Sequence, residues 1–225
     1  MLPRLKFSDG AIETLKWVAL VLMTLDHINK YLLHDSVPAL FAIGRTTMPL
    51  FAVVLAFNLA RPGALEGGAA ERTIKRLALF GAVATVPFIA LGGLIAGWWP
   101  LNVMATLAVS TGIIYLQAKG GACRRVLAVL LFIIGGGFVE FWWPGVALCV
   151  SAWHYCKAPR WSALLVWLAS MSALTIINQN WWAFAAVPAI LAALQVRVEL
   201  PRLRRVFYAY YPAHLAAIWA LARHI

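Results

Sequence analysis

An aspartate and a histidine stand side by side in the middle of the first long apolar segment, 11–33, and they are the residues best suited to chemistry. Asp26 and His27 interrupt a run that otherwise reads as a membrane-spanning helix. Ionisable side chains at membrane depth are costly, so they are retained where they serve a function or pair with one another. Neighbours in a helix point about 100° apart, so each is expected to contact a different helix. The alternative is a histidine with a purely structural role in the bundle core.

The second apolar segment, 37–60, carries an arginine and a proline in its interior. Arg45 lies too far inside the segment to reach the interface easily. Pro49 has no N–H, so the carbonyl of Arg45 loses its helical partner and a kink is expected there. Because the first segment runs outward and the second returns, Arg45 and Asp26 are expected at a similar depth. An ion pair between Asp26 and Arg45 could have a purely structural role, joining two helices, or it could also take part in function.

The last apolar segment, 205–223, holds a second histidine, His214, close behind Tyr210 and Tyr211. Counted from the basic end of the segment, His214 lies near mid-membrane, at the depth expected for His27. Histidine is the side chain that titrates near neutral pH without a perturbed environment. The two histidines are therefore the natural proton-handling groups, and packing alone does not account for so many polar side chains at one depth.

Two further polar residues are secondary candidates for contact with a substrate. Asn102 lies just inside the fourth apolar segment, where it could equally cap a helix. Glu140 lies at the outer end of the fifth segment, where a charge is cheap. No grouping of histidine, cysteine and carboxylate has the spacing of a metal site, and no phosphate-binding glycine motif or nucleophilic serine elbow is visible. We expect no metal.

The elements that must position these residues are apolar helices that fill almost the whole chain. Of the 225 residues 63% are hydrophobic, and the mean hydropathy is +0.82, whereas globular proteins are about 45–50% apolar. Since a span needs about 20 residues, we expect an all-α, polytopic transmembrane bundle of about nine spans, forming a single integral membrane domain over 1–225. The expected spans are 11–33, 37–60, 73–96, 100–118, 124–140, 143–157, 161–177, 180–195 and 205–223.

The basic residues, which give a formal net charge of +11, predict the orientation of the bundle. They gather in alternate connections between the spans, not in one arm that would bind nucleic acid. These connections are the N-terminal tail, 61–76, 119–125, 157–160 and 197–205, the last of which includes Arg202. Lysine and arginine accumulate on the cytoplasmic side of membrane proteins. We therefore expect the N-terminus in the cytoplasm, the C-terminus in the periplasm, and a bacterial inner membrane as the location.

Three turns on the opposite side each carry a tryptophan pair. The pairs are Trp98-Trp99, Trp142-Trp143 and Trp181-Trp182. Indole rings favour the level of the lipid headgroups, so an aromatic belt explains them. An aromatic rim around an outer entrance is the alternative.

Three motifs of the chain resemble the TraX family of conjugal-transfer membrane proteins. They are 15–28 with its Asp-His pair, 43–52 with Gly-Arg and Pro-Leu-Phe, and 210–215 with Tyr-Pro-Ala-His-Leu. Asn102 with Thr106, and an acidic residue before the sixth segment, also fit. Glu140-Phe141 stands where the family pattern has Asp-Tyr, which puts the role of that position in doubt.

The resemblance implies a reaction and partners. The best-known member of the family N-acetylates the processed pilin subunit of a conjugative plasmid with acetyl-CoA, and the family includes TrbP-like conjugal-transfer proteins. The implied activity is that of a membrane acetyltransferase. It would move an acetyl group from cytoplasmic acetyl-CoA to the N-terminal amine of a pilin subunit, or of a similar acceptor facing the periplasm. The implied partners are acetyl-CoA, that pilin subunit and the lipid bilayer.

The same resemblance gives the polar residues expected roles. Acyl transfer to an amine needs a base for the amine proton and donors for the charge that develops on the carbonyl oxygen. His27 is the expected base, and His214 is its partner or a proton relay. Arg45 and Tyr211 are the expected donors. Asp26 would orient Arg45 or His214.

Two sets of binding residues complete the expected site. The expected substrate-binding residues are Asn102, Glu140 and Tyr210. The expected binding residues for the phosphates of CoA are Lys16, Arg72, Lys75 and Arg76. A basic surface attracts such an anion, although cytoplasmic topology explains a basic loop equally well.

Two other functions remain open. A non-enzymatic assembly partner that holds pilin in the membrane would need Asp26, His27 and Arg45 only for stability. A small proton-coupled transporter would also place histidine and aspartate at mid-membrane. The odd number of expected spans and the lack of a clear inverted repeat weigh against the transporter.

Overall fold

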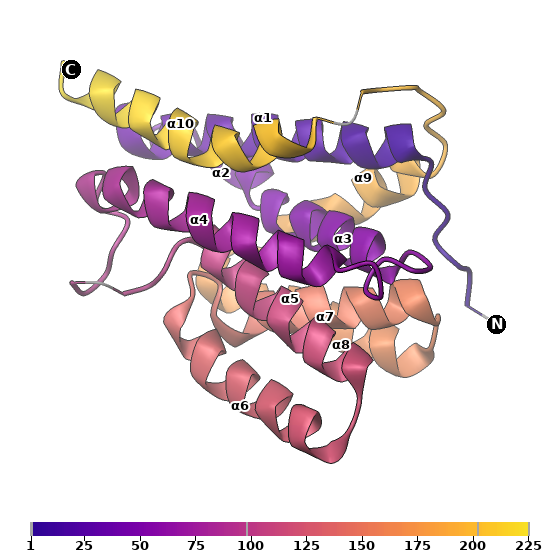
Figure 1. Ribbon diagram of the computed structural model, residues 1–225. Coiled ribbons are helices and arrows are strands. Elements are labelled where there is room, and N and C mark those ends of the chain that lie inside the picture. The colour runs from indigo at the N-terminus through magenta and orange to yellow at the C-terminus, as the bar shows by residue number, and fades with distance from the viewer. Residues whose placement is uncertain (1, 98, 202, 225) are drawn as a thin grey trace.

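The computed structural model describes residues 2–97, 99–201 and 203–224, and these residues form a bundle of helices without β-strands (Figure 1). The helices are α1 (Asp9–Leu32), α2 (Pro38–Gly44), α3 (Thr47–Ala60), α4 (Ala69–Ala90), α5 (Val103–Lys119), α6 (Ala122–Phe138), α7 (Trp142–Lys157), α8 (Trp161–Asn178), the 3-10 turn η1 (Trp182–Ala185), α9 (Ala186–Ala193) and α10 (Arg204–Ala222). The all-α prediction is confirmed. Trp98 and Arg202 lie outside the described residues.

Helices far apart in the sequence pack side by side to form the core. α10 packs against α4 and α1, and α3 packs against α7 and α1. The core side chains are small or aliphatic, with Leu50, Leu148, Leu174 and Leu215 fully buried. The first and last helices are thereby brought into contact, so polar residues from 11–33 and 205–223 can meet.

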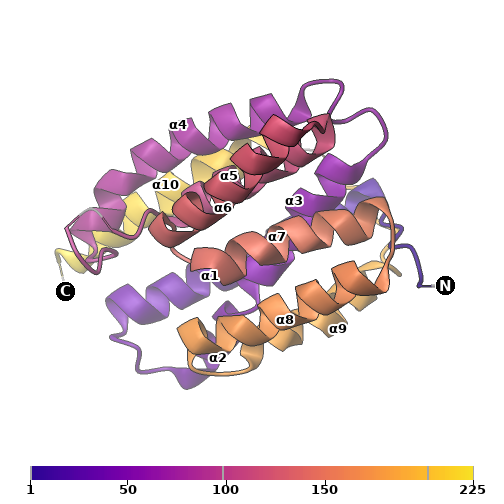
Figure 2. The same cartoon turned by 90° about the horizontal axis from the view of Figure 1, so that it is seen from below.

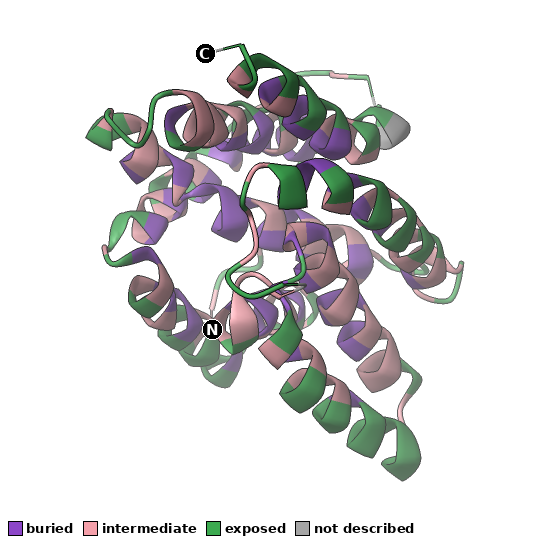
Figure 3. Cartoon of the chain, turned by 90° about the vertical axis from the view of Figure 1, so that its left-hand side faces the viewer, coloured by how far each residue is buried: buried purple, intermediate pink, exposed green. Residues whose placement is uncertain are grey.

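The outward faces of several helices are apolar. In Figure 3 the exposed residues follow the outer side of each helix and the buried ones the inner side. On α6 the exposed side chains include Val126, Val129, Ile133 and Ile134. Soluble monomers rarely leave contiguous apolar faces of this extent in water, whereas lipid covers them without cost. The chain is therefore a helical membrane protein.

Length and composition identify some helices as spans more clearly than others. Among the described residues, three segments are long and apolar enough to cross a membrane: Pro38–Ala60, Ala69–Ala90 and Trp161–Asn178. The remaining helices are shorter, carry more charge, as α1 does, or are less apolar, as α10 is. The prediction of about nine complete spans goes further than this and stays a prediction.

The predicted segments match the helices one for one except at the second and the eighth. The second segment is not kinked at Pro49 but broken at Arg45 and Thr46, between α2 and α3. Pro49 then lies in the first turn of α3, where its missing N–H costs nothing. The eighth segment is split into η1 and α9, which together span 12 residues from Trp182 to Ala193. At about 1.5 Å per residue this element is too short to cross a bilayer by itself.

The basic connections lie together at one end of the bundle. In Figures 1 and 2 the N-terminus, the α3–α4 loop, the α7–α8 loop and the α9–α10 connection gather at one end. The C-terminus and the α1–α2 and α8–η1 connections lie at the other end. The termini are thus at opposite ends, as an odd number of passes requires.

The described tryptophans at that second end are partly packed and partly exposed. The Trp99 ring stacks on Trp142 with 5.8 Å between centroids, and its Nε1 donates to the Gly137 carbonyl at 2.7 Å. Trp143, Trp181 and Trp182 are exposed on the surface. The aromatic belt at the headgroup level stays a prediction, with an aromatic rim around an outer entrance as the alternative.

Candidate functional site

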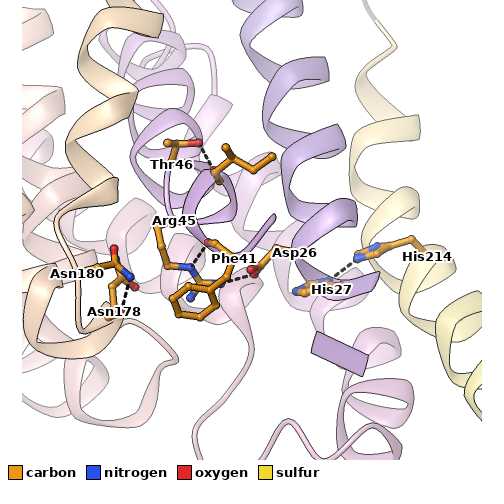
Figure 4. A network of polar contacts seen from close by, with 9 residues as sticks. Asp26, His27, Phe41, Arg45, Thr46, Asn178, Asn180 and His214 are labelled. Carbon is orange, nitrogen blue, oxygen red and sulfur yellow. Dashed lines mark hydrogen bonds and ion pairs between the residues drawn. The ribbon is translucent and has the colours of Figure 1, made fainter. Parts of the chain in front are cut away.

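The two histidines predicted at one depth are in direct contact. His27 Nδ1 lies 2.7 Å from His214 Nε2, and the two rings are parallel, with 5.0 Å between their centroids (Figure 4). His214 Nδ1 lies 3.0 Å from the carbonyl oxygen of Tyr210, one turn earlier in α10. The Tyr210 ring also stacks on His214, at 5.2 Å. α1 and α10 therefore present one continuous chain of hydrogen-bonding groups.

The order of these groups determines where the protons are. A carbonyl oxygen can only accept, so His214 Nδ1 carries the proton of its bond to Tyr210. In a neutral His214, Nε2 then holds a lone pair, and His27 Nδ1 must donate to it. His27 is left with an unprotonated Nε2. This is the tautomer that a general base needs, fixed by the partner behind it, as a carboxylate fixes the histidine of a serine protease.

An ion pair between Asp26 and Arg45 lies beside the histidines. The guanidinium of Arg45 donates to the Asp26 carboxylate, and both side chains are largely buried. Arg45 Nε also donates to the Phe41 carbonyl at 3.3 Å, and the guanidinium lies over the Phe41 ring at 4.4 Å. These contacts fix the arginine at the α2–α3 break, where irregular backbone is tolerated because it lines a cavity.

Gly44 makes the close approach of α1 and α2 possible. A Cβ at this position would lie 2.5 Å from both Cβ and Cγ of Asp26. Real side-chain atoms do not approach so closely, so any larger residue would push Asp26 away from Arg45. Sequence reasoning assigned no role to Gly44, although it directly precedes the buried arginine.

A cavity of about 160 Å³, which we call the distal cavity, opens beside these groups toward the end that lacks the basic loops. Its ionisable lining residues among the described part of the chain are Asp26, His27, Lys30, Asp35, Arg45 and Glu140, with the tyrosines Tyr31 and Tyr211. His214 lies behind His27 and does not line this cavity. Four of the five predicted catalytic residues therefore line this cavity: Asp26, His27, Arg45 and Tyr211. The fifth, His214, contacts His27 from behind.

A larger cavity of about 400 Å³, which we call the basic cavity, opens toward the basic end of the bundle. Its charged lining residues among the described part of the chain are Lys16, Arg61, Arg72, Arg76 and Glu13. Lys16 pairs with Glu13 at 2.6 Å, and Arg61 pairs with Asp9 at 2.6 Å. Much of the remaining wall is apolar and includes Leu20, Leu59, Leu77 and Leu107. Arg61 was not among the predicted binding residues.

The two cavities share part of their lining. Met23, Phe51, Val103 and Tyr211 line both. These side chains form a thin partition between a space that reaches the basic loops and a space that contains His27. Tyr211 is 3% exposed and lies at this junction.

Three predicted site residues lie elsewhere. Asn102 caps α5 through Met104 N at 3.1 Å, and its Nδ2 donates to the Gly81 carbonyl of α4 at 2.9 Å. Tyr210 lines neither cavity; its hydroxyl lies 2.8 Å from Thr24 Oγ1. Lys75 is exposed on α4 and is outside the basic cavity. The structure does not bring these three to a cavity.

Two lining residues that sequence reasoning missed are Thr47 and Asn178. Both are buried and line the distal cavity. Thr47 lies two residues after Arg45, inside the 43–52 motif, and Asn178 begins an Asn-Gln-Asn run at the end of an apolar segment. A search for polar residues inside apolar segments would have found them.

Buried polar pairs at the centre of an apolar helical bundle, with one cavity beside them and a second that shares part of its lining, define a helical membrane protein with an internal candidate site. The family sequence model described as "TraX protein" matches residues 11–222. The chain therefore belongs to the TraX family.

Two curated relatives are similar in sequence. A protein named "Protein TraX" from Escherichia coli is 28% identical over 232 aligned residues, which cover 97% of this chain and 90% of the relative. A second "Protein TraX", from Escherichia coli strain K12, is 31% identical over 129 residues, covering 56% of this chain and 48% of that relative. No solved structure matches.

Proposed function

We propose that this protein is an acetyltransferase of the bacterial inner membrane. It would move an acetyl group from cytoplasmic acetyl-CoA to the N-terminal amine of a conjugative pilin subunit, or of a similar acceptor facing the periplasm. The observation that carries the proposal is that two cavities from opposite ends share part of their lining, and that one of them contains a histidine whose Nε2 is held unprotonated. Adjacent cavities that face opposite ends suit a donor and an acceptor that arrive from different compartments.

The basic cavity fits the donor. Its volume of about 400 Å³ lies in the range of small-molecule sites. Lys16, Arg61, Arg72 and Arg76 would hold the phosphates of CoA at the mouth, since guanidinium and ammonium groups bind phosphate by charge-assisted hydrogen bonds. The apolar walls of this cavity suit the narrow, weakly polar arm of CoA that carries the thioester. Bound acetyl-CoA would supply a thioester carbonyl carbon, to which the amine forms a C–N bond as the C–S bond breaks and CoA leaves as its thiol.

His27 handles the proton in this proposal. Its free Nε2 accepts a proton from the amine nitrogen, and the positive charge is shared through Nδ1–H with His214. The Tyr210 carbonyl and stacked ring stabilise the charge on His214. His27 then returns the proton to the departing sulfur, so both histidines end neutral.

Arg45 and Tyr211 stabilise the charge that develops on the carbonyl oxygen. Both line the distal cavity, and Tyr211 also lines the basic cavity. Donors that are already in place when charge develops need no reorganisation, which is the largest single contribution in many enzymes. Asp26 holds Arg45 in position and keeps the local charge near neutral.

The test is intact-mass spectrometry of pilin co-expressed with the wild-type protein or with His27→Gln. His154→Gln is the matched control, because His154 is exposed and bonds Gln117 outside both cavities. We expect pilin to gain the mass of one acetyl group with the wild type and His154→Gln, and not with His27→Gln at equal membrane level. Unmodified pilin in all three samples would contradict the proposal and favour an assembly partner.

A further inference from the structure

Two buried polar atoms on the walls of the distal cavity have no hydrogen-bond partner among the described residues. They are Thr47 Oγ1, at the start of α3, and Asn178 Oδ1, at the end of α8. Their residues are only 9% and 3% exposed. A buried oxygen without a hydrogen-bond partner is costly, so both atoms are suited to a ligand that brings donors into the cavity. The mechanism above uses neither of them.

The charge balance of the distal cavity favours a cation. Its described lining includes three carboxylates, Asp26, Asp35 and Glu140, and two cations, Lys30 and Arg45. The ion pair of Asp26 with Arg45 leaves two carboxylates facing one lysine. The described lining of the basic cavity has four cations and one carboxylate, so the two cavities have opposite preferences.

Helix ends of both signs lie at this cavity, so they add no preference of their own. The C-terminal end of α8, at Asn178, lines the cavity, and so do the N-terminal ends of α5, at Val103, and of α7, after Phe141. The preference for a cation therefore comes from the carboxylates.

Glu140 is held in place by the backbone around it. Its N–H donates to the Leu101 carbonyl at 2.8 Å, and Leu101 N donates to the Phe138 carbonyl at 2.8 Å. The loop before α7 is thereby fixed to the loop before α5. The carboxylate lines the distal cavity together with Thr47 and Asn178, which come from two other helices.

We infer that Glu140, Asn178 and Thr47 form a binding site for the primary ammonium group at the end of a peptide. An ammonium group has three N–H donors and no acceptor. The three residues offer a carboxylate, an amide oxygen and a hydroxyl oxygen, all of which accept. A substrate that presents a neutral hydroxyl group, such as a sugar, would gain no electrostatic stabilisation from the excess of carboxylates in this cavity.

This site deepens the proposed function, on which its role as the acceptor site rests. The ammonium would be held in the cavity that His27 lines. It loses one proton to water to become the reactive amine, and His27 accepts the next proton as the C–N bond forms. Once acetylated, the nitrogen is neutral and has one N–H, so the product loses most of what the site recognises. Release of the product then follows from the same contacts that select the substrate.

The test is equilibrium binding to the purified full-length protein in detergent. The probes are trialanine amide with a free N-terminus and the same peptide with an N-terminal acetyl group. We expect the free amine to bind at least about tenfold more tightly, and Glu140→Gln or Asn178→Leu to remove that difference, since a lost hydrogen bond to a charged group is worth more than tenfold in affinity.

Matched variants separate this site from general damage to the fold. Thr111→Val is the control for Thr47→Val, because the buried Thr111 hydroxyl already donates to the Leu107 carbonyl at 2.7 Å and lines neither cavity. Asn58→Leu, in the basic cavity, is the control for Asn178→Leu. All variants are compared for CoA binding, which Glu140→Gln and Asn178→Leu should leave unchanged.

The outcomes distinguish this site from the acetyltransferase itself. Equal binding of the two peptides by the wild type, or no binding of either, overturns the ammonium site. So does full binding by Glu140→Gln, Asn178→Leu and Thr47→Val. Selective amine binding without acetyl transfer would keep the site and remove the proposed activity. Acetyl transfer by a protein that binds both peptides equally would keep the proposed activity and remove the ammonium site.

Discussion

At the scale of single residues, the order of hydrogen bonds between α1 and α10 decides which nitrogen can act as a base. The Tyr210 carbonyl fixes the proton of His214, and His214 fixes the proton of His27. The histidine that lines the distal cavity is left with a free Nε2, while the other lies behind it. His214 is thus a positioning residue in this account.

His214→Phe tests that role. Phenylalanine keeps a planar ring beside Tyr210 but cannot accept from His27 Nδ1, so the favoured tautomer and ring position are lost. We expect kcat for pilin acetylation to fall roughly 100-fold or more, within the range of general-base catalysis, with the KM for acetyl-CoA little changed. A variant with wild-type kcat would show that His27 acts without this partner.

Gly44→Ala tests the close approach of α1 and α2. The added Cβ would lie 2.5 Å from two atoms of Asp26. We expect a loss of about 1–3 kcal/mol in stability from overpacking, together with lower acetyl transfer because Asp26 and Arg45 are moved apart. Thermal unfolding in detergent measures the first effect.

Gly137→Ala is the control for that variant, because a Cβ there meets Trp143 at an ordinary 3.4 Å. Equal unfolding temperatures for Gly44→Ala and Gly137→Ala would contradict the account.

The sequence predicted much of the site at this scale. An ionisable residue in an apolar segment is visible without a structure, so the histidines, Asp26 and Arg45 could be named and their depth compared. The direction of the His27–His214 bond could not, because it depends on a third group, the Tyr210 carbonyl. A search for polar residues in apolar segments would also have named Thr47 and Asn178, but not their lack of a hydrogen-bond partner, which depends on the packing around them.

At the scale of elements, the broken second helix and the first turns of α4 build the two cavities. The sequence predicted a kink near Arg45, because Pro49 removes an N–H. It did not predict a complete break, which also depends on the Thr46 hydroxyl bonding the Ile43 carbonyl. The face of α4 that carries Arg72 and Arg76 lines the basic cavity, whereas Lys75 points away from it.

Arg72→Gln and Arg76→Gln test the role of this face. Each substitution removes one charge from the mouth of the basic cavity, and charge-assisted hydrogen bonds to phosphate are strong. We expect each variant to raise the Kd for CoA about tenfold, since such a bond contributes about 1.5–3 kcal/mol. Isothermal titration of the purified protein measures this.

Lys75→Gln provides the matched control on the same helix. It removes the same charge from an exposed position outside the cavity, so its effect should be small. An equal loss of affinity in all three variants would show that CoA responds to overall charge and not to this cavity.

At the scale of the whole molecule, the bundle places the basic cavity at one end and the distal cavity, with its excess of carboxylates, at the other. The sequence predicted this polarity from the alternating basic loops, and the structure gathers those loops at one end. The sequence could not predict that the two cavities share part of their lining, because Met23, Phe51, Val103 and Tyr211 come from four different helices.

Cysteine labelling tests the orientation of the bundle. Cys123 is exposed near the α5–α6 turn at the basic end, and Ser36 is exposed in the α1–α2 loop at the other end. In intact spheroplasts a membrane-impermeant maleimide should label Ser36→Cys, and should label Cys123 only after permeabilisation. Labelling of Cys123 from outside would reverse the proposed orientation.

Inside-out membrane vesicles that contain pilin test the central claim most directly. Acetyl-CoA with a deuterated acetyl group is added to the exposed cytoplasmic face, and the mass of the pilin N-terminal peptide is measured with the wild-type protein, His27→Gln and His154→Gln. The account predicts the labelled acetyl group on that peptide with the wild type and His154→Gln, and its absence with His27→Gln. Label transferred equally by His27→Gln, or by none of the three in vesicles with pilin present, would contradict it.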